Sequence, residues 1–323
     1  QRHLRRLHDL GAAAIEADFG EEAPIDGVYH DGTLGHLAHN QYPLLYNRAV
    51  AEATHDATGE WIIWARSAWA GSHRYPLHWG GDSSANWDNL GPQLAAGLSM
   101  GASGFSFWSQ DIGGFWAVDP VGGDLLVRWV QAGLMLSHAR IHGTGTRELD
   151  TLPPDLLAAI RPALELRYRL FPYLTGEAHR SAAAGLPMAR PLVIEFPDDP
   201  TTWHVDDQWL LGEHLLVAPQ LDSSGRRRAY RPAGRWLDWW TGATIDGRPW
   251  ATSTSTRATT SYSGGWLPST GGRPPVSSGF PTGPWPGHGT RRSTSTWATS
   301  TAKTSWSEVG AAGARWPAVG GPG

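Results

Sequence analysis

The first 250 residues alternate short apolar segments with longer stretches of helical periodicity. Candidate strands lie at residues 11–18, 61–66, 74–79 and 104–108. Between them, residues 42–58 predict a helix. A second helix is predicted after Trp87, because Leu90, Leu94 and Leu98 recur every four residues and share one face. This order is typical of an α/β fold with parallel strands.

The second half of this region changes character. Residues 155–184 have helical spacing, and Pro162 and Pro172 are expected to kink or divide the helix. Residues 188–196 predict a strand. From residue 207 onward short strands alternate with turns, which indicates a β-rich module.

Charged or aromatic residues end each candidate strand of the first part. They are Asp18, Arg66, Trp79 with Asp82, and Trp108 with Asp111. In a (β/α)8 barrel the carboxyl ends of the strands converge on one active site. A doubly wound sheet also clusters such residues, but the sequence has no glycine-rich phosphate fingerprint. We therefore predict the α/β class and a (β/α)8 TIM barrel.

The composition excludes several classes of protein. The 323 residues contain no cysteine, which rules out a disulfide scaffold, a thiolate metal site and a cysteine nucleophile. The net charge of −4 argues against binding nucleic acid. No apolar run reaches the ~18 to 20 residues of a membrane helix. No signal peptide is visible, so we expect a cytoplasmic protein, although the sequence begins at Gln1 rather than at a methionine.

A metal centre is not expected either. His36 and His39 have a three-residue spacing that can suit a metal ion on a helix. No third ligand follows, and the sequence around them is not that of a zinc hydrolase. We therefore predict no metal site.

The last part of the chain differs from the rest. Up to Trp250 there are 20 Arg and 29 Asp or Glu, whereas residues 251–323 have six basic residues and one acid. This tail also contains 25 Ser or Thr and too few large apolar residues to bury a core. A natural disordered linker is one explanation. We favour a reading-frame error in a G+C-rich gene, which 25 Arg against one Lys suggests.

Two carboxylates on separate strands, with aromatic and arginine side chains around them, suit glycoside hydrolysis. One attacks the anomeric carbon and the other donates a proton to the leaving oxygen. Four segments resemble glycoside hydrolase family 31, the retaining α-glucosidase and α-xylosidase family: EADFGEEAP at 16–24, ARSAWAGSHRYPLHWGGDS at 65–83, FWSQDIGGF at 107–115 and SHARIHG at 137–143. The resemblance runs from about Leu7 to Trp250 and is nearest to the bacterial α-xylosidases.

The resemblance implies a catalytic (β/α)8 barrel and roles for individual residues. Asp18 in DFGE would be the nucleophile, and Asp82 in HWGGD the general acid and then the base. Arg66 and His142 would hydrogen-bond the hydroxyls of the sugar. Further contacts with the substrate would come from three aromatic residues and one acid, namely Trp79, Trp108, Phe115 and Asp111. The resemblance implies an oligosaccharide or α-glycoside substrate and no cofactor.

Several of these assignments have a structural alternative. Arg66 can simply pair with a neighbouring acid, and His142 can be a structural histidine. Trp108 and Phe115 can pack in the core instead of facing a ligand.

One position departs from the family pattern next to the nucleophile. Glu16 and Ala17 precede Asp18, where the most similar branch has Lys-Thr. That lysine commonly faces the sugar, so we include Glu16 among the substrate-binding residues. We predict that Glu16 alters the choice of substrate or weakens activity.

These observations predict three parts. Residues 1–205 would form the C-terminal part of the barrel, about strands 4 to 8, residues 206–250 the start of a β-rich domain, and residues 251–323 a disordered tail. A half barrel exposes open strand edges. We therefore expect a retaining exo-α-glycosidase for terminal xylosyl or glucosyl units that is inactive as this isolated chain. Alternatives are an α-transglucosidase, a sulfoquinovosidase, or a non-catalytic carbohydrate-binding protein; a homo-oligomer is also open.

Overall fold

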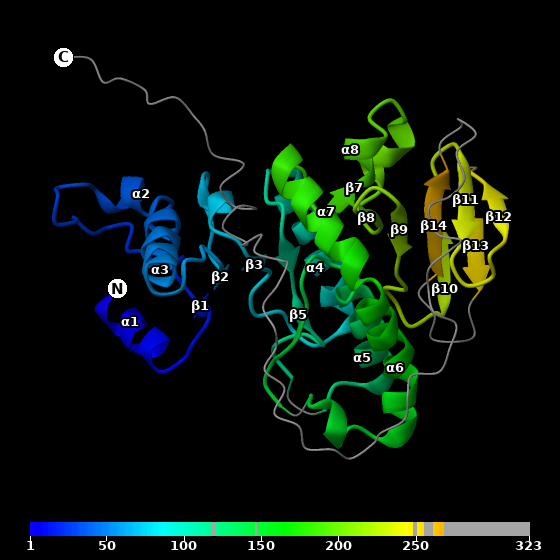
Figure 1. The fold of residues 1–323 in the computed structure, drawn as a ribbon, viewed down its shortest axis with the longest axis horizontal. Helices are drawn as coiled ribbons and strands as arrows, with labels where there is room; N and C mark the ends of the chain where they lie inside the picture. The colour runs from blue at the N-terminus through cyan, green and yellow to red at the C-terminus, as the bar shows by residue number, and fades with distance from the viewer. Residues whose placement is uncertain (118–119, 146, 248–250, 255–260, 268–323) are drawn as a thin grey trace.

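The computed structural model describes residues 1–117, 120–145, 147–247, 251–254 and 261–267, and its first part consists of parallel strands connected by helices (Figure 1). Four strands form one parallel sheet in the order β1-β2-β3-β4: Ile15–Ala17, Ile63–Ala65, His78–Trp79 and Trp108–Ser109. A second parallel pair contains β5 (Asp111–Ile112) and β6 (Arg140–Ile141). The predicted α/β class and parallel strands are confirmed.

The helices predicted at 42–58, after Trp87 and within 155–184 are confirmed. The eight α-helices among the described residues are α1 (Arg2–Asp9), α2 (Gly35–Ala38), α3 (Tyr42–Thr58), α4 (Trp87–Ala102), α5 (Gly123–Gly133), α6 (Pro154–Arg169), α7 (Phe171–Ala184) and α8 (Leu192–Glu195). Short 3-10 helices are Ser72–Arg74, Leu149–Thr151 and Pro200–His204.

Local signals explain several helix ends. The helix α3 ends at Gly59, whose φ of 80° places it in the left-handed region that favours glycine. The helix α4 begins after Asn86, whose side-chain oxygen accepts the Asn89 amide at 3.0 Å. Pro172 divides the predicted long helix, since α7 starts one residue before it. Pro162 lies inside α6 and does not end it.

The second part is an antiparallel β region. A six-stranded sheet has the order β12-β11-β14-β9-β8-β7, and these strands are Thr244–Asp246, Arg235–Asp238, Ser261–Leu267, Leu215–Ala218, Trp209–Leu211 and Ala189–Pro191. A separate pair contains β10 (Arg226–Ala229) and β13 (Ala251–Thr254). The strand predicted at 188–196 is only half right, because its second half turns into α8.

Two strands lie in the segment predicted to be a disordered tail. The backbone of β13 pairs with β10, and β14 pairs with β9 and β11. Strand pairing needs only backbone hydrogen bonds, so a segment rich in Ser and Thr can complete a sheet. The rest of the predicted tail, residues 255–260 and 268–323, lies outside the described residues.

The largest hydrophobic cluster contains residues of both parts of the fold. It includes Leu94 of α4, Trp129 of α5, Ile160 of α6 and Trp209 of β8, each almost fully buried. A smaller cluster packs β1 and β2 against α3 and contains Ile15, Ile63 and Val50 among its members. Within the described residues, no helix is long and apolar enough to cross a membrane.

Candidate active site

The predicted catalytic residues follow neighbouring parallel strands, as the sequence indicated. Asp18 comes directly after β1, Arg66 directly after β2, and Asp82 three residues after β3. The parallel register of these strands brings their carboxyl ends together at one edge. The side chains of Asp18 and Asp82 are 45% and 31% exposed, so both can reach a ligand from solvent.

Arg66 connects the two carboxylates. Its Nη1 lies 2.9 Å from Oδ1 of Asp18 and 3.6 Å from Oδ2 of Asp82. Its Nη2 lies 2.5 Å from a carboxylate oxygen of Glu21. Burial by itself lowers the pKa of Arg66, but the hydrogen bond and charge of Glu21 and the charges of Asp18 and Asp82 together raise it above its usual value. The guanidinium is therefore a permanent cation between three acids.

The turn after β1 fixes the direction of Asp18. Phe19 has a φ of 59°, which a non-glycine residue adopts at a cost of about 1–3 kcal/mol. Its amide donates to Oδ1 of Asp18 at 2.9 Å, and its ring lies 4.3 Å from the Arg66 guanidinium. A Cβ at Gly20 would come within 2.5 Å of Ser67, so the turn requires glycine there. From α3, the Tyr46 hydroxyl donates to the Asp18 carbonyl at 3.0 Å.

A second ion cluster lies beside the first. Arg140 of β6 contacts Glu16 of β1 at 2.7 Å through Nη1 and Asp111 of β5 at 2.8 Å through Nη2. Its guanidinium also lies over the rings of Trp64 and Trp79, 5.0 and 5.2 Å from their centres. Burial raises the pKa of Asp111, whose side chain is 1% exposed, and the nearby Arg140 partly opposes this. Glu16 thus pairs with a cation on a strand of the second parallel pair.

The predicted aromatic wall divides into two groups. Phe115 and His142 lie together with ring centres 5.5 Å apart, and both are half-buried. Trp79 is buried under Arg140. Trp108 belongs to the main core, where a Cβ at Gly97 of α4 would overlap its ring at 2.1 Å. For Trp108 the position favours core packing, the alternative that the sequence left open.

Three residues that contact this site were not singled out from the sequence. Glu21 completes the group around Arg66, and its position three residues after Asp18 in DFGE was the available signal. Arg140 lay within the SHARIHG segment without an assigned role. Trp64 precedes Arg66 by two residues, so both side chains leave the same face of β2.

The two histidines considered for a metal do not gather ligands. Nδ1 of His39 lies 2.6 Å from the Ala23 carbonyl. Among the described residues, no group of three or more His, Asp or Glu side chains has a metal-binding arrangement.

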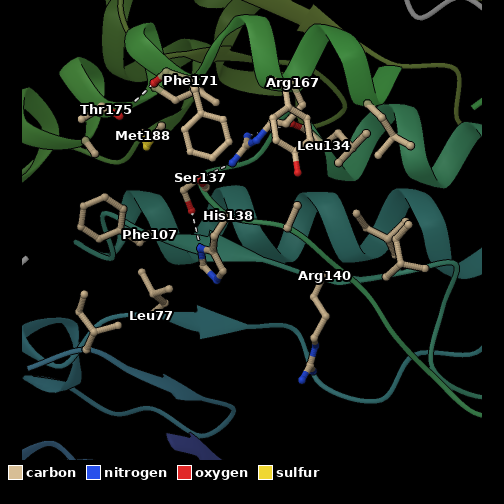
Figure 2. A pocket seen from close by; sticks show the side chains of 18 residues that line it. Leu77, Phe107, Leu134, Ser137, His138, Arg140, Arg167, Phe171, Thr175 and Met188 are labelled. Carbon is tan, nitrogen blue, oxygen red and sulfur yellow. Dashed lines mark hydrogen bonds between the residues drawn. The ribbon is translucent and has the colours of Figure 1, made fainter. Parts of the chain in front are cut away.

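A separate cavity of about 560 Å³ lies between β6 and the helices α6 and α7. Figure 2 shows its lining, which is mostly apolar and includes Phe107, Phe171 and Met188, with the Ser137–His138 hydrogen bond among these side chains. Arg140 extends away from the two helices (Figure 2). Asp18 and Asp82 do not line this cavity, so it is not the candidate catalytic site.

Comparison with known proteins identifies the family that this site resembles. The model described as "Glycosyl hydrolases family 31 TIM-barrel domain" matches residues 1–176. The model described as "Glycosyl hydrolase family 31 C-terminal domain" matches residues 185–266. The two models together span both parts of the fold.

Individual relatives are α-glycosidases by name. An α-xylosidase of Emericella nidulans is 38% identical over 264 residues, which are 78% of this chain and 34% of the relative. Alpha-glucosidase 2 of Bacillus thermoamyloliquefaciens is 31% identical over 74% of this chain and 32% of its own length. A solved α-xylosidase from a soil metagenome, complexed with xylose, has a TM-score of 0.74 and 32% identity over 80% of this chain and 43% of its own. The chain therefore spans about a third of the length of the curated relatives it matches.

Proposed function

Since the chain belongs to glycosyl hydrolase family 31, we propose that it carries the catalytic centre of a retaining exo-α-glycosidase that removes terminal α-linked xylosyl or glucosyl units. The observation that supports this is the contact of Asp18 and Asp82 with one nitrogen of Arg66. The two distances from Arg66 Nη1 place Oδ1 of Asp18 and Oδ2 of Asp82 at most about 6.5 Å apart. Retaining enzymes separate their carboxyl groups by ~5 to 5.5 Å, whereas inverting enzymes need ~6.5 to 9.5 Å for a water molecule.

In the proposed reaction Asp18 attacks the anomeric carbon while Asp82 protonates the glycosidic oxygen. The carbon–oxygen bond to the leaving group breaks, and the sugar becomes an ester of Asp18. Asp82 then removes a proton from water, whose oxygen attacks the same carbon and releases Asp18. Two inversions give net retention. The cation of Arg66 keeps the Asp18 carboxylate oriented before attack.

The charges of the site favour a neutral sugar. Arg66 is paired with Asp18, Glu21 and Asp82, and Arg140 is paired with Glu16 and Asp111. An anionic sugar would have to compete with these carboxylates for both arginines. This argues against the sulfoquinovosidase alternative. The names of the relatives support both a xylosyl and a glucosyl substrate.

Covalent labelling tests the proposed roles even though we expect this isolated chain not to turn over substrate, because the label needs only the first of the two steps. A fluorine-substituted α-xylosyl fluoride, which forms a glycosyl ester quickly and releases it slowly, should label one carboxylate of the chain. Peptide mapping by mass spectrometry is expected to place the label on Asp18. Fluoride leaves without a proton, so Asp82→Asn should still be labelled, whereas Asp18→Asn should not.

Two results would overturn this proposal. A label on a carboxylate other than Asp18 would refute the assignment of the nucleophile. Absence of any label, in a chain that nevertheless binds xylose in a saturation-transfer NMR experiment, would favour the non-catalytic carbohydrate-binding protein. The matched control is Asp88→Asn, at an acid in the first turn of α4, and it should label like the unmodified chain.

A further inference from the structure

An exposed tryptophan follows the segment that contains Asp111. Trp116 is 56% exposed, whereas Trp79 and Trp108 are almost fully buried. A single exposed aromatic residue is common on protein surfaces and carries no meaning alone. Trp116 differs from such a residue because it is held against the loop that follows Asp82.

Backbone hydrogen bonds fasten Trp116 to that loop. The amides of Phe115 and Trp116 both donate to the Ser83 carbonyl, at 2.7 and 2.9 Å, and the Ala85 amide donates to the Trp116 carbonyl at 2.8 Å. A Cβ at Gly114 would come within 2.5 Å of the Ala85 Cα, so the two segments are in direct backbone contact. Trp116 is therefore held at a fixed distance from Asp82, the neighbour of Ser83.

A hollow of about 470 Å³ opens next to this contact. It is lined by Ser84, Ala85 and Asn86 from one loop and by Trp116 and Ala117 from the other. Its volume is in the range of small-molecule sites, which are ~300 to 1,000 Å³. Pro120, Val121 and Gly122 complete the lining. It therefore combines an indole ring and aliphatic groups with a hydroxyl and an amide, the groups that contact the apolar face and the hydroxyls of a sugar.

We propose that Trp116 and the 84–86 loop form the subsite for the leaving group, with the pyranose ring next to the scissile bond stacked on the indole. This rests on the proposed function, in which Asp82 protonates the oxygen that joins the two sugars. The leaving ring must lie beside the acid, and the hollow starts two residues after Asp82. The aromatic rings support this order, because His142 contacts Phe115, which meets Trp116 edge to face at 4.9 Å. Phe115 thus lies between His142, which is expected to bind the terminal sugar, and the leaving-group subsite.

Ligand-observed NMR can test the subsite on the chain as it exists. The probe is a sulfur-linked α-xylosyl-glucose disaccharide, which resists hydrolysis, and free xylose is the reference. Saturation should pass to both rings of the disaccharide. Stacking removes about 50 Å² of apolar sugar surface from water, so Trp116→Ala should raise the Kd of the disaccharide roughly tenfold. The Kd of xylose should not change, and Trp116→Phe should keep most of the affinity.

Each outcome separates the subsite from the proposed function. Saturation of neither ring in the unmodified chain would contradict the sugar site itself, and with it the subsite. Saturation of the xylosyl ring alone, or an unchanged disaccharide Kd in Trp116→Ala, would overturn only the subsite. Equal loss of xylose and disaccharide binding would assign Trp116 a structural role instead. The matched control is Trp203→Ala, at a tryptophan that is 59% exposed in the 3-10 helix Pro200–His204, and it should bind like the unmodified chain.

Discussion

One buried and one half-buried histidine are expected to make the fold less stable in mild acid. His78 of β3 is 1% exposed, and its ring packs edge to face against Phe105 at 4.9 Å. Burial lowers its pKa to about 3. His138 bonds Ser137 at 2.9 Å and has a buried Nε2; burial, followed by the charge of Arg167, lowers its pKa to about 3 as well. Figure 2 shows His138 among the side chains that line the apolar cavity.

The sign follows from comparing the folded and unfolded states. The ordinary histidine pKa is 6.5, so below pH 6.5 the unfolded chain binds a proton at each position while the folded chain does not. Stability therefore falls as the pH drops from 6.5 toward 3. Between pH 7 and pH 5 each histidine removes about 2 kcal/mol from the free energy of unfolding, and the pair removes about 4 kcal/mol. The raised pKa of Asp111 acts in the opposite direction.

Urea denaturation at pH 7 and pH 5 measures this effect. The unmodified chain is compared with His78→Gln, His138→Gln and the double variant, since glutamine does not titrate. Each single variant should lose about 2 kcal/mol less than the unmodified chain between the two pH values, and the double variant about 4 kcal/mol less. His55→Gln is the control, because that residue lies in the last turn of α3, away from β3 and outside the cavity that His138 lines. Proton uptake on unfolding at pH 5 gives a second measurement and does not depend on the variants being stable.

If all these variants lose the same stability between pH 7 and pH 5, the two histidines do not cause the loss. The same conclusion follows if the imidazole NMR signals of His78 and His138 in the folded chain titrate near pH 6.5. Either result would mean that water or a hydrogen-bond partner reaches the two rings and stabilises the charged form.

Two further substitutions test the ion pairs. Glu16→Lys places a second cation against Arg140, so the ratio of the labelling rates with α-xylosyl and α-glucosyl reagents should change. Glu16→Gln should keep this ratio. Equal ratios in the unmodified chain and both variants would contradict a role for Glu16 in specificity. Glu177 of α7 is fully buried 3.7 Å from Arg190, so Glu177→Gln should cost about 3 kcal/mol of unfolding free energy in urea; an unchanged midpoint and slope would contradict it.

Much of the site was predictable because its residues follow strands. Asp18, Arg66 and Asp82 each come after a short apolar strand, and parallel strands bring their carboxyl ends together. The helix 42–58 was predicted with its observed bounds, since Gly59 provides a strong end signal. Local patterns of this kind depend on neighbours in the chain, which the sequence contains in full.

Other features were not predictable because they depend on distant contacts. The second half of 188–196 is apolar enough for a strand, but it turns into α8 and packs in the β region through Leu192. The strands β13 and β14 have little apolar pattern, and the backbones of β9, β10 and β11 pair with them. The strands that pair with β13 and β14 come from other parts of the chain, so periodicity within residues 251–267 does not indicate that this segment forms strands.

By itself, the sequence determined the alternation of strands and helices in the first part, the family, and the two carboxylates expected to act on a sugar. Only the tertiary structure decided the partner of each charge. Glu16 faces Arg140, and Arg66 holds two carboxylates at once. It also placed Trp116 beside the loop of Asp82. The physical reason is that ion pairs and stacked rings act over a few ångströms between strands and loops far apart in the chain, and only folding brings those segments into contact.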